Sequence, residues 1–224
     1  MEIRESIAKF LFPPRCPICN SLMPFETKDI AHTPCLESLV FGTYVFPHKI
    51  DGGRYMDTVH SVFSYSGKTS DFIRVFKARM NVHSIRLVRE ILIESLKQDF
   101  FDGVDMLVPV PMYKNREKAK GYNHSLTVAE ILAQITGKPV YNAMAAHTFR
   151  RPQKEVPYAL RAENVRDCFA VYDKNLLNAK AILLIDDIYT TGNTMNECSK
   201  VLRECGAVTV KGFALASLST VILY

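Results

Sequence analysis

The segment AILLIDDIYTTGNTMNECSKVL, residues 181–202, decides the fold class because it joins a buried strand to a helix through a polar loop. Its first five residues, AILLI (181–185), are continuously apolar, as expected for a central parallel strand that is covered on both faces. Two carboxylates, Asp186 and Asp187, follow at once. Ligands of open α/β sheets bind at the carboxyl ends of strands, so these two side chains are predicted to lie at the end of the strand and in a binding site.

The loop after the two aspartates leads into a predicted amphipathic helix. Unpaired backbone N–H groups at a helix N-terminus bind anions, and threonine hydroxyls add further donors. Gly192 would allow the backbone to turn close to a ligand. Carboxylates for hydroxyl groups or a metal, placed beside donors for phosphate, together predict a sugar-phosphate site. The candidate phosphate-binding residues are Thr190, Thr191, Gly192, Asn193 and Thr194.

Two other interpretations of this segment are available. A strand that ends in two aspartates also resembles the magnesium-holding acidic motif of P-loop nucleotidases, but the chain has no G-x4-G-K-[ST] loop and no G-x-G-x-x-G loop. The second alternative is a solvated strand end followed by a threonine-capped helix. That alternative does not explain why acidic and phosphate-binding features occur together.

The pattern around this segment alternates between strands and helices. The run DMLVPVPMY (105–113) is a short apolar strand that ends in prolines, and HSLTVAEILAQITG (124–137) is a helix that stops at its glycine. The run VTVKGFALAS (208–217) forms a last strand. This alternation predicts an α/β fold with a mostly parallel sheet flanked by helices.

The region before residue 105 carries less chemical information. Residues 46–60 are interpreted as a linker, and a strand is predicted around Phe63 and Tyr65. Two amphipathic helices follow and are predicted to cover the sheet. Their apolar faces contain Phe72, Val75 and Phe76 in the first helix, and Ile85, Val88, Leu92 and Leu96 in the second.

Composition excludes several classes of protein. The 224 residues are 48% hydrophobic and 23% charged, which fits a globular protein rather than a disordered or fibrous one. The longest apolar runs are strand-sized, below the roughly 18 residues that a membrane span requires, and the N-terminus lacks a secretory signal. The protein is therefore expected to be cytoplasmic, without membrane insertion. Its net charge of +5 suits phosphate-bearing ligands or nucleic acid without requiring either.

The N-terminal residues contain a candidate metal site. Cys16-Pro-Ile-Cys19 is a C-x2-C pair, and His32-Thr-Pro-Cys35 is an H-x2-C pair, with 12 residues between the two pairs. Three thiolates and one imidazole at this spacing can close a tetrahedron around a structural zinc ion. The alternative is that only the first two cysteines lie together and that His32 and Cys35 are incidental.

The remaining cysteines have a different setting. Cys168, Cys198 and Cys205 fall in segments predicted as strand or helix, and a disulfide framework is improbable in a cytoplasmic chain of this size. They are predicted to be small core residues. The predicted domains are a small zinc-ribbon module, residues 1–45, and the α/β domain, residues 46–224.

Three segments resemble known proteins. ILLIDDIYTTGNT resembles the phosphoribosyl diphosphate (PRPP) binding motif of type I phosphoribosyltransferases, which has a strand, two acidic residues and a T-T-G-x-T loop. VPVPMYKNREKAKGYNHSLTVAEILA and RRPQKEVPYALRAENVRDCFAV are similar to segments of the ComF family, which is associated with DNA uptake and is amidophosphoribosyltransferase-like. Together with the zinc ribbon, the resemblance covers essentially the whole chain. His32 replaces a usual cysteine, and His124, which replaces a usual glutamine, is interpreted as an exposed helix-start residue without a catalytic role.

The resemblance implies a type I phosphoribosyltransferase-like fold and a set of roles. Asp186 and Asp187 would be the catalytic residues that hold the ribose 2′ and 3′ hydroxyls, directly or with magnesium, while residues 190–194 would wrap the 5-phosphate. Other implied ligand contacts are Met112, Tyr113 and Lys114 in a pyrophosphate loop, with Arg116, Lys118 or Lys120 beside it, and Arg150, Arg151 and Lys154 on a mobile hood.

The implied function is that of a phosphoribosyltransferase, a glycosyltransferase of the pentosyl class. It would bind PRPP with magnesium and transfer the phosphoribosyl group to an unidentified acceptor with release of pyrophosphate. The alternative is a non-enzymatic competence protein that retains a sugar-phosphate site and contacts single-stranded DNA and the DNA-uptake machinery. YKNREKAKGY (113–122) is the one stretch with basic and aromatic residues interleaved. The expected cofactors are structural zinc and magnesium with PRPP.

Overall fold

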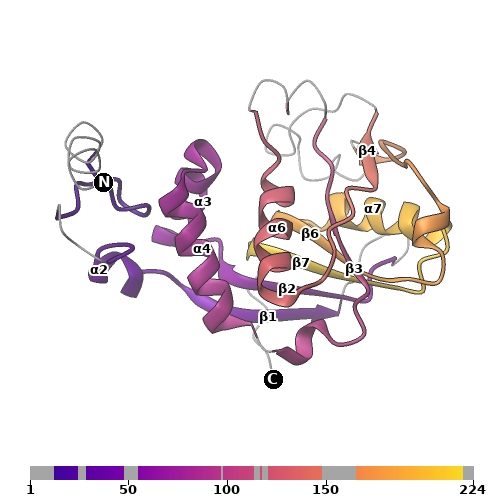
Figure 1. The fold of residues 1–224 in the computed structure, drawn as a ribbon, viewed down its shortest axis with the longest axis horizontal. Helices are drawn as coiled ribbons and strands as arrows, with labels where there is room; N and C mark the ends of the chain where they lie inside the picture. Colours follow the sequence, from indigo (N-terminus) through magenta and orange to yellow (C-terminus); the bar gives the residue numbers. More distant parts are fainter. Residues whose placement is uncertain are drawn as a thin grey trace, which may run out of the picture.

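The computed structural model describes residues 13–24, 29–47, 55–96, 98–113, 117, 121–147 and 165–218. Its main feature is a five-stranded sheet (Figure 1). In spatial order the strands are β1 (Phe41–Pro47), β2 (Thr58–Ser64), β7 (Thr209–Ser217), β6 (Ala181–Tyr189) and β3 (Met106–Pro109). The last four of these run parallel, and β1 pairs antiparallel with β2 at one edge. The predicted mostly parallel sheet is therefore confirmed.

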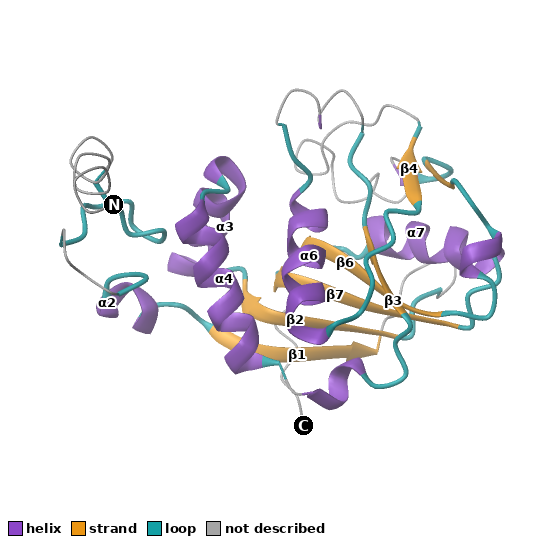
Figure 2. Ribbon diagram, viewed as in Figure 1, coloured by secondary structure: helices purple, strands orange, loops and turns teal. Residues whose placement is uncertain are grey.

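Helices cover both faces of this sheet (Figure 2). They are α3 (Gly67–Arg79), α4 (Val82–Ser95), α6 (His124–Thr136) and α7 (Asn193–Glu204). Successive side chains of β6 separate the two cores: Leu183 and Ile185 pack with α3, α4 and α6, whereas Ile182 and Leu184 pack with α7. Because both faces are covered, residues 182–185 are all buried.

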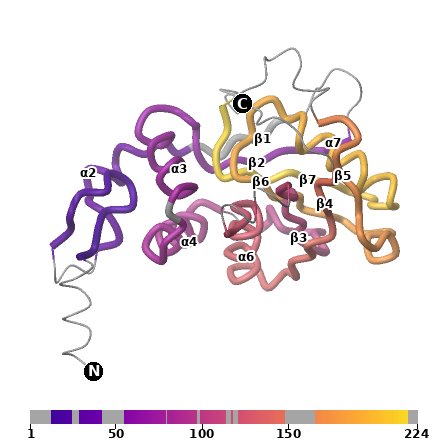
Figure 3. The backbone as a smooth tube through the Cα atoms, turned by 90° about the horizontal axis from the view of Figure 1, so that it is seen from above, coloured from indigo at the N-terminus to yellow at the C-terminus, as the bar shows by residue number. Residues whose placement is uncertain are grey.

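Smaller elements complete the described part of the chain. A separate two-stranded antiparallel sheet consists of β4 (Met144–Ala146) and β5 (Phe169–Val171), and the short helices are α2 (Thr33–Glu37), η1 (Gln98–Phe101) and η5 (Asn175–Leu177). Seen from above, α2 lies at the opposite end of the molecule from α7 and the small sheet (Figure 3). Across the described ranges, every helix is too short or too polar to cross a lipid bilayer.

The end of the central strand was predicted too early. β6 runs to Tyr189, four residues beyond the predicted end at Ile185, because it stays hydrogen-bonded to β7 along that whole stretch. Its pairing with β3 stops at Ile185. Asp186 and Asp187 therefore lie within the strand, on the part that extends past its pairing with β3.

The linker predicted at residues 46–60 was wrong at both of its ends. Residues 46–47 end β1 and residues 58–60 begin β2. As a result, β1 crosses the predicted domain boundary after residue 45. Its sequence, FGTYVFP, contains glycine and proline, which both disfavour strand interiors, and this explains why it was missed.

The N-terminal residues pack onto the same core as the helices that follow them. Cys16, Ile18 and Met23 are buried in the apolar cluster that also contains Phe72 of α3. In addition, the main-chain N–H of Val40 donates to the Thr69 hydroxyl at 2.8 Å. The candidate metal module is thus held against α3 by apolar contacts and by a hydrogen bond at its end.

The cysteines of the larger domain are core residues, as predicted. Cys168, Cys198 and Cys205 are buried, and none of the three forms a disulfide. They belong to the apolar cluster between the sheet and α7, together with Met195 and Leu202. Their packing gives them a structural explanation without a disulfide or a metal.

Candidate functional site

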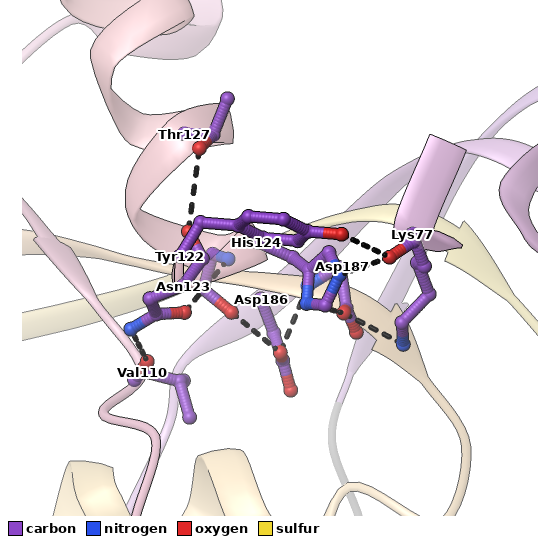
Figure 4. A network of polar contacts seen from close by, with 9 residues as sticks. Lys77, Val110, Tyr122, Asn123, His124, Thr127, Asp186 and Asp187 are labelled. Carbon is purple, nitrogen blue, oxygen red and sulfur yellow. Dashed lines mark hydrogen bonds and ion pairs between the residues drawn. The ribbon is translucent and has the colours of Figure 1, made fainter. Parts of the chain in front are cut away.

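The acidic pair of β6 is held by contacts from three different elements (Figure 4). Asp186 Oδ1 accepts hydrogen bonds from the Ser125 hydroxyl at 3.0 Å and from the N–H of Asp187 at 2.8 Å. Asp187 Oδ2 lies 2.7 Å from Nζ of Lys77, which comes from the last turns of α3. Both carboxylates are therefore fixed by contacts within the described part of the protein.

The surroundings of Asp186 and Asp187 reduce the negative charge of the pair. Burial and the neighbouring carboxylate of Asp187 raise the pKa of Asp186 to about 7, although the Asp187 N–H, Lys77 and Ser125 oppose this shift. Near neutral pH the pair thus carries less than its full negative charge. A bound group that donates hydrogen bonds, or a cation, would favour the ionised form.

The start of α6 links this pair to the end of β3. Asn123 caps the helix, because its side-chain oxygen accepts from the N–H of Ser125 at 3.0 Å. Its Nδ2 donates to the carbonyl of Val110 at 3.1 Å, and the N–H of Val110 in turn donates to the carbonyl of Ile185 in β6 at 2.8 Å. One capping residue therefore positions Ser125 against Asp186 and fixes the segment after β3.

His124 is not the exposed helix-start residue that the sequence predicted. Its exposed fraction is 1%, and its Nε2 lies 2.8 Å from the carbonyl oxygen of Lys77. Since a carbonyl can only accept, Nε2 carries a proton, and Nδ1 lies 3.7 Å from Asp187 Oδ2. The prediction failed because the C-terminal end of α3 covers the first turn of α6, which is a tertiary contact without a local signal.

Lys77 was likewise missed by sequence reasoning. It directly follows Phe76 at the edge of the apolar face of α3, where a lysine reads as an ordinary solvated residue. The contact with Asp187 spans 110 positions of sequence, and no spacing rule for helices or strands predicts it. A search for cations beside apolar helix faces would have marked it as one of several equivalent candidates.

The predicted phosphate loop is shaped by Gly192. This residue has φ = 75° and precedes α7 as its N-cap, so it contributes no side-chain acceptor to the first turn. A side chain at this φ would be strained, which explains the glycine. Thr190 and Thr191 lie between the end of β6 and Gly192, and Asn193 and Thr194 open α7. The predicted loop-to-helix arrangement is present, and Gly192 places no capping side chain at the N-terminus of α7.

The candidate pyrophosphate loop is described in part. Met112 and Tyr113 follow β3 and are partly buried, and Tyr113 forms a parallel bridge with Ala146 of β4. This places the loop after β3 beside the small sheet. The remaining predicted cations, Lys114, Arg116, Lys118, Lys120, Arg150, Arg151 and Lys154, lie outside the described residues.

The four candidate zinc ligands come together, as predicted. The ligand atoms of Cys16, Cys19, His32 and Cys35 all lie within 4.8 Å of one another. Tetrahedral ligands about 2.3 Å from zinc would be separated by roughly 3.8 Å, so a small contraction completes the site. The alternative in which His32 and Cys35 are incidental is therefore wrong, and the cluster can hold a zinc ion.

Local contacts of this cluster suit a metal. His32 Nδ1 faces Cys19 Sγ at 3.4 Å, while Nε2 lies 3.2 Å from the carbonyl of Leu22, an arrangement that orients the ring as ligating histidines require. Burial and the neighbouring thiols raise the pKa of Cys35 to about 12. For Cys19, burial is outweighed by hydrogen bonds from Ser21 and His32, and the pKa falls to about 6. Crowded thiols of this kind are stabilised as thiolates by a cation.

Curated proteins similar to this chain carry two kinds of name. No family model matches the chain. "Competence protein ComFC" of Bacillus subtilis is 25% identical over 201 residues, which cover 89% of this chain and 76% of that protein. "Competence protein F" of Haemophilus influenzae is 30% identical over 116 residues, half of each chain. "Amidophosphoribosyltransferase" of Staphylococcus aureus is 28% identical over 210 residues, 85% of this chain but 38% of that protein.

Solved structures give looser matches. A glutamine PRPP amidotransferase from B. subtilis has a TM-score of 0.38 and 22% identity, over 64% of this chain and 27% of that one. A purine phosphoribosyltransferase from Pyrococcus horikoshii has a TM-score of 0.37 and 18% identity, over 62% and 76%. The sequence relatives are more informative, because one of them spans nearly the whole chain. They confirm the resemblance to the ComF family that the sequence motifs indicated.

Proposed function

We propose that this chain is a ComF-like phosphoribosyltransferase that binds PRPP with magnesium and transfers the phosphoribosyl group to an acceptor. The observation that carries this proposal is one strand-loop-helix unit in which Asp186 and Asp187 precede the glycine-capped N-terminus of α7. Carboxylates accept hydrogen bonds from ribose hydroxyls, and helix N–H groups bind phosphate. Similarity to an amidophosphoribosyltransferase over 85% of the chain supports the same assignment.

The proposed complex uses each part of the site once. Asp186 and Asp187 accept from the ribose 2′ and 3′ hydroxyls, residues 190–194 surround the 5-phosphate, and residues 112–114 lie along the diphosphate. Carboxylate and phosphate oxygens are also the ligands that magnesium prefers, and the ion would enter as its complex with PRPP.

The proposed reaction is a displacement at C1 of the ribose. The bond between C1 and the diphosphate oxygen breaks, and its electron pair leaves with pyrophosphate. A lone pair of the acceptor forms the new bond to C1, and the acceptor proton is released to solvent. Positive charge develops on the sugar ring, which the two nearby carboxylates of Asp186 and Asp187 stabilise. Magnesium that arrives with PRPP would neutralise charge on the leaving pyrophosphate.

Calorimetry tests this proposal. Wild-type protein should bind PRPP in the presence of magnesium, and a screen of amine and nucleobase acceptors should then detect release of pyrophosphate. Asp187→Asn should weaken PRPP binding by about 1 to 3 kcal/mol, roughly 5- to 150-fold, the scale of hydrogen bonds to charged groups. The exposed control Asp102→Asn should bind like wild type. Absence of PRPP binding by the wild type would overturn the proposal.

A non-enzymatic role in DNA uptake is the second candidate. It is favoured by similarity along 89% of the chain to a protein named for competence. In this role the sugar-phosphate site would bind its ligand without group transfer, and single-stranded DNA or the uptake machinery would be the partner. Binding of PRPP without pyrophosphate release for any acceptor, combined with binding of single-stranded DNA, would favour this candidate over the enzyme.

A further inference from the structure

Lys77 reaches the acidic pair from outside the strand-loop-helix unit. Its Nζ lies 2.7 Å from Asp187 Oδ2, and the side chains of Lys77 and Asp187 are 29% and 14% exposed. Within the described part of the chain, no other lysine or arginine pairs with Asp186 or Asp187. The candidate ribose site thus contains a cation as well as two carboxylates.

The main chain at Lys77 is fixed by two side chains at the start of α6 (Figure 4). The carbonyl of Lys77 accepts from the Tyr122 hydroxyl at 3.1 Å and from His124 Nε2 at 2.8 Å. Carbonyls in the last turn of a helix have no intrahelical donor, and α3 ends at Arg79. The rings of Tyr122 and His124 also pack edge to face, with centroids 5.2 Å apart. These contacts hold the base of the Lys77 side chain at a fixed place beside β6.

We propose that Lys77 is a ribose-contacting residue of the sugar-phosphate site, and that Tyr122 and His124 are its positioning residues. This inference rests on the proposed function. An ammonium group has three N–H donors, and the contact with Asp187 occupies one of them. A second can donate to the oxygen of a ribose hydroxyl whose own proton is donated to Asp187. The hydroxyl is then recognised both as a donor and as an acceptor.

Packing of α3 on the sheet does not by itself require the contact between Lys77 and Asp187. α3 is already held by Phe72 and Phe76, whose side chains are fully buried in the core. The ammonium instead lies against a carboxylate that the proposed function assigns to the ribose, and the Lys77 side chain retains contact with solvent. If the ion pair of Lys77 with Asp187 only stabilised the fold, replacement of Lys77 would leave ligand affinity unchanged.

Replacement of Lys77 separates these two roles. Lys77→Met keeps the length of the side chain without its charge, Lys77→Gln is a second neutral variant, and Lys68→Met is an exposed control on the same helix. Affinity for ribose 5-phosphate and for PRPP, each with and without magnesium, is measured by calorimetry, and circular dichroism verifies folding. Both neutral variants should bind both ligands at least tenfold more weakly than wild type, and Lys68→Met should not differ from it.

Each other outcome has a defined meaning. If wild type binds both ligands and the neutral variants bind equally well, the role of Lys77 is overturned and the proposed function stands. If the loss is confined to PRPP, the contact is with the diphosphate, and the ribose contact is overturned. If wild type binds neither ligand, the proposed function fails, and this inference fails with it.

The positioning role of His124 has its own test. His124→Gln keeps an N–H donor for the Lys77 carbonyl, whereas His124→Leu removes it. We expect His124→Leu to weaken ribose 5-phosphate binding at least threefold and His124→Gln to restore most of the affinity. In a Lys77→Met background, His124→Leu should cause no further loss. An equal loss in both backgrounds, or failure of His124→Gln to restore affinity, would overturn the positioning role.

Discussion

The charge of Asp186 depends strongly on its surroundings, and this gives a prediction for how stability changes with pH. Its pKa is raised from an ordinary value near 3.8 to about 7, through burial and the charge of Asp187. The folded protein therefore binds the proton more tightly than the unfolded chain. The resulting stabilisation is complete below about pH 4 and is lost as pH rises through 7. Asp186→Asn, which retains an oxygen acceptor for Ser125, should remove this dependence.

Urea unfolding at several pH values measures the effect. At pH 8, Asp186→Asn should be more stable than wild type by a few kcal/mol, since each unit of pKa shift corresponds to roughly 1.4 kcal/mol. Near pH 4 the two proteins should differ little. Asp102→Asn, at an exposed position, is the control for the loss of one carboxylate. A variant with the same pH profile as wild type would contradict the raised pKa.

Gly192 gives a second prediction at the same scale. Its φ of 75° lies in the left-handed region, where a β-branched side chain is strongly disfavoured. Gly192→Val should therefore destabilise the fold by about 1 to 3 kcal/mol and weaken the binding of both ribose 5-phosphate and PRPP. Gly192→Asn is the matched variant, because asparagine tolerates this conformation and should recover much of the stability. If valine at this position changes neither melting temperature nor affinity, the loop does not depend on its glycine.

The residues of the site differ in how far sequence could predict them. Asp186, Asp187 and Gly192 were predictable because strand, acidic pair and loop are consecutive in the chain and form one local unit. Lys77 and His124 were not, because their roles arise where the end of α3 meets the start of α6. Such a contact depends on how two helices pack on the sheet, and residue spacing within either helix does not predict it.

At the scale of elements, the predictions were best where one physical signal was strong. α6 begins at His124 and ends before Gly137, as its capping asparagine and terminal glycine indicate. β6 was recognised from its continuous apolar run, yet its end was misplaced, because the later residues are polar and are kept in the strand only by pairing with β7. The edge strand β1 was missed altogether. Strand pairing between distant segments decided both errors.

The metal module gives a prediction that concerns a whole element. Purified protein should contain about one zinc per chain by elemental analysis, and Cys16→Ser should lose the metal and lower the melting temperature, because the ion organises the segment that contains its ligands. His32→Cys is the matched control: it restores a fourth ligand and should retain zinc, whereas His32→Ala should not. Metal content near zero in freshly purified, unchelated protein would contradict the site.

At the scale of the whole molecule, the acidic pair lies where the parts of the chain converge. β6 extends past its pairing with β3, and Asp186 and Asp187 lie on that extension. The first half of the chain supplies Lys77 from α3, and the middle supplies Ser125 and His124 from α6. A ligand bound there would therefore connect segments that are far apart in sequence, and its binding should stabilise the fold as a unit by mass action.

Single-stranded DNA gives the last prediction, which depends on charge summed over the molecule. The chain carries a net charge of +5, and the stretch 113–122 contains four lysines and arginines. If this stretch contacts DNA, binding of an oligo-dT strand should be non-specific, and the slope of log affinity against log salt should be about −2 to −3, since each neutralised phosphate contributes roughly −0.7. Lys118→Gln combined with Lys120→Gln should reduce the slope by about 1.4.

Lys68→Gln combined with Lys174→Gln removes the same charge elsewhere, so an equal change in both double variants would show that net charge, and not this stretch, governs the interaction. An affinity that does not respond to salt would rule out the basic stretch as the contact.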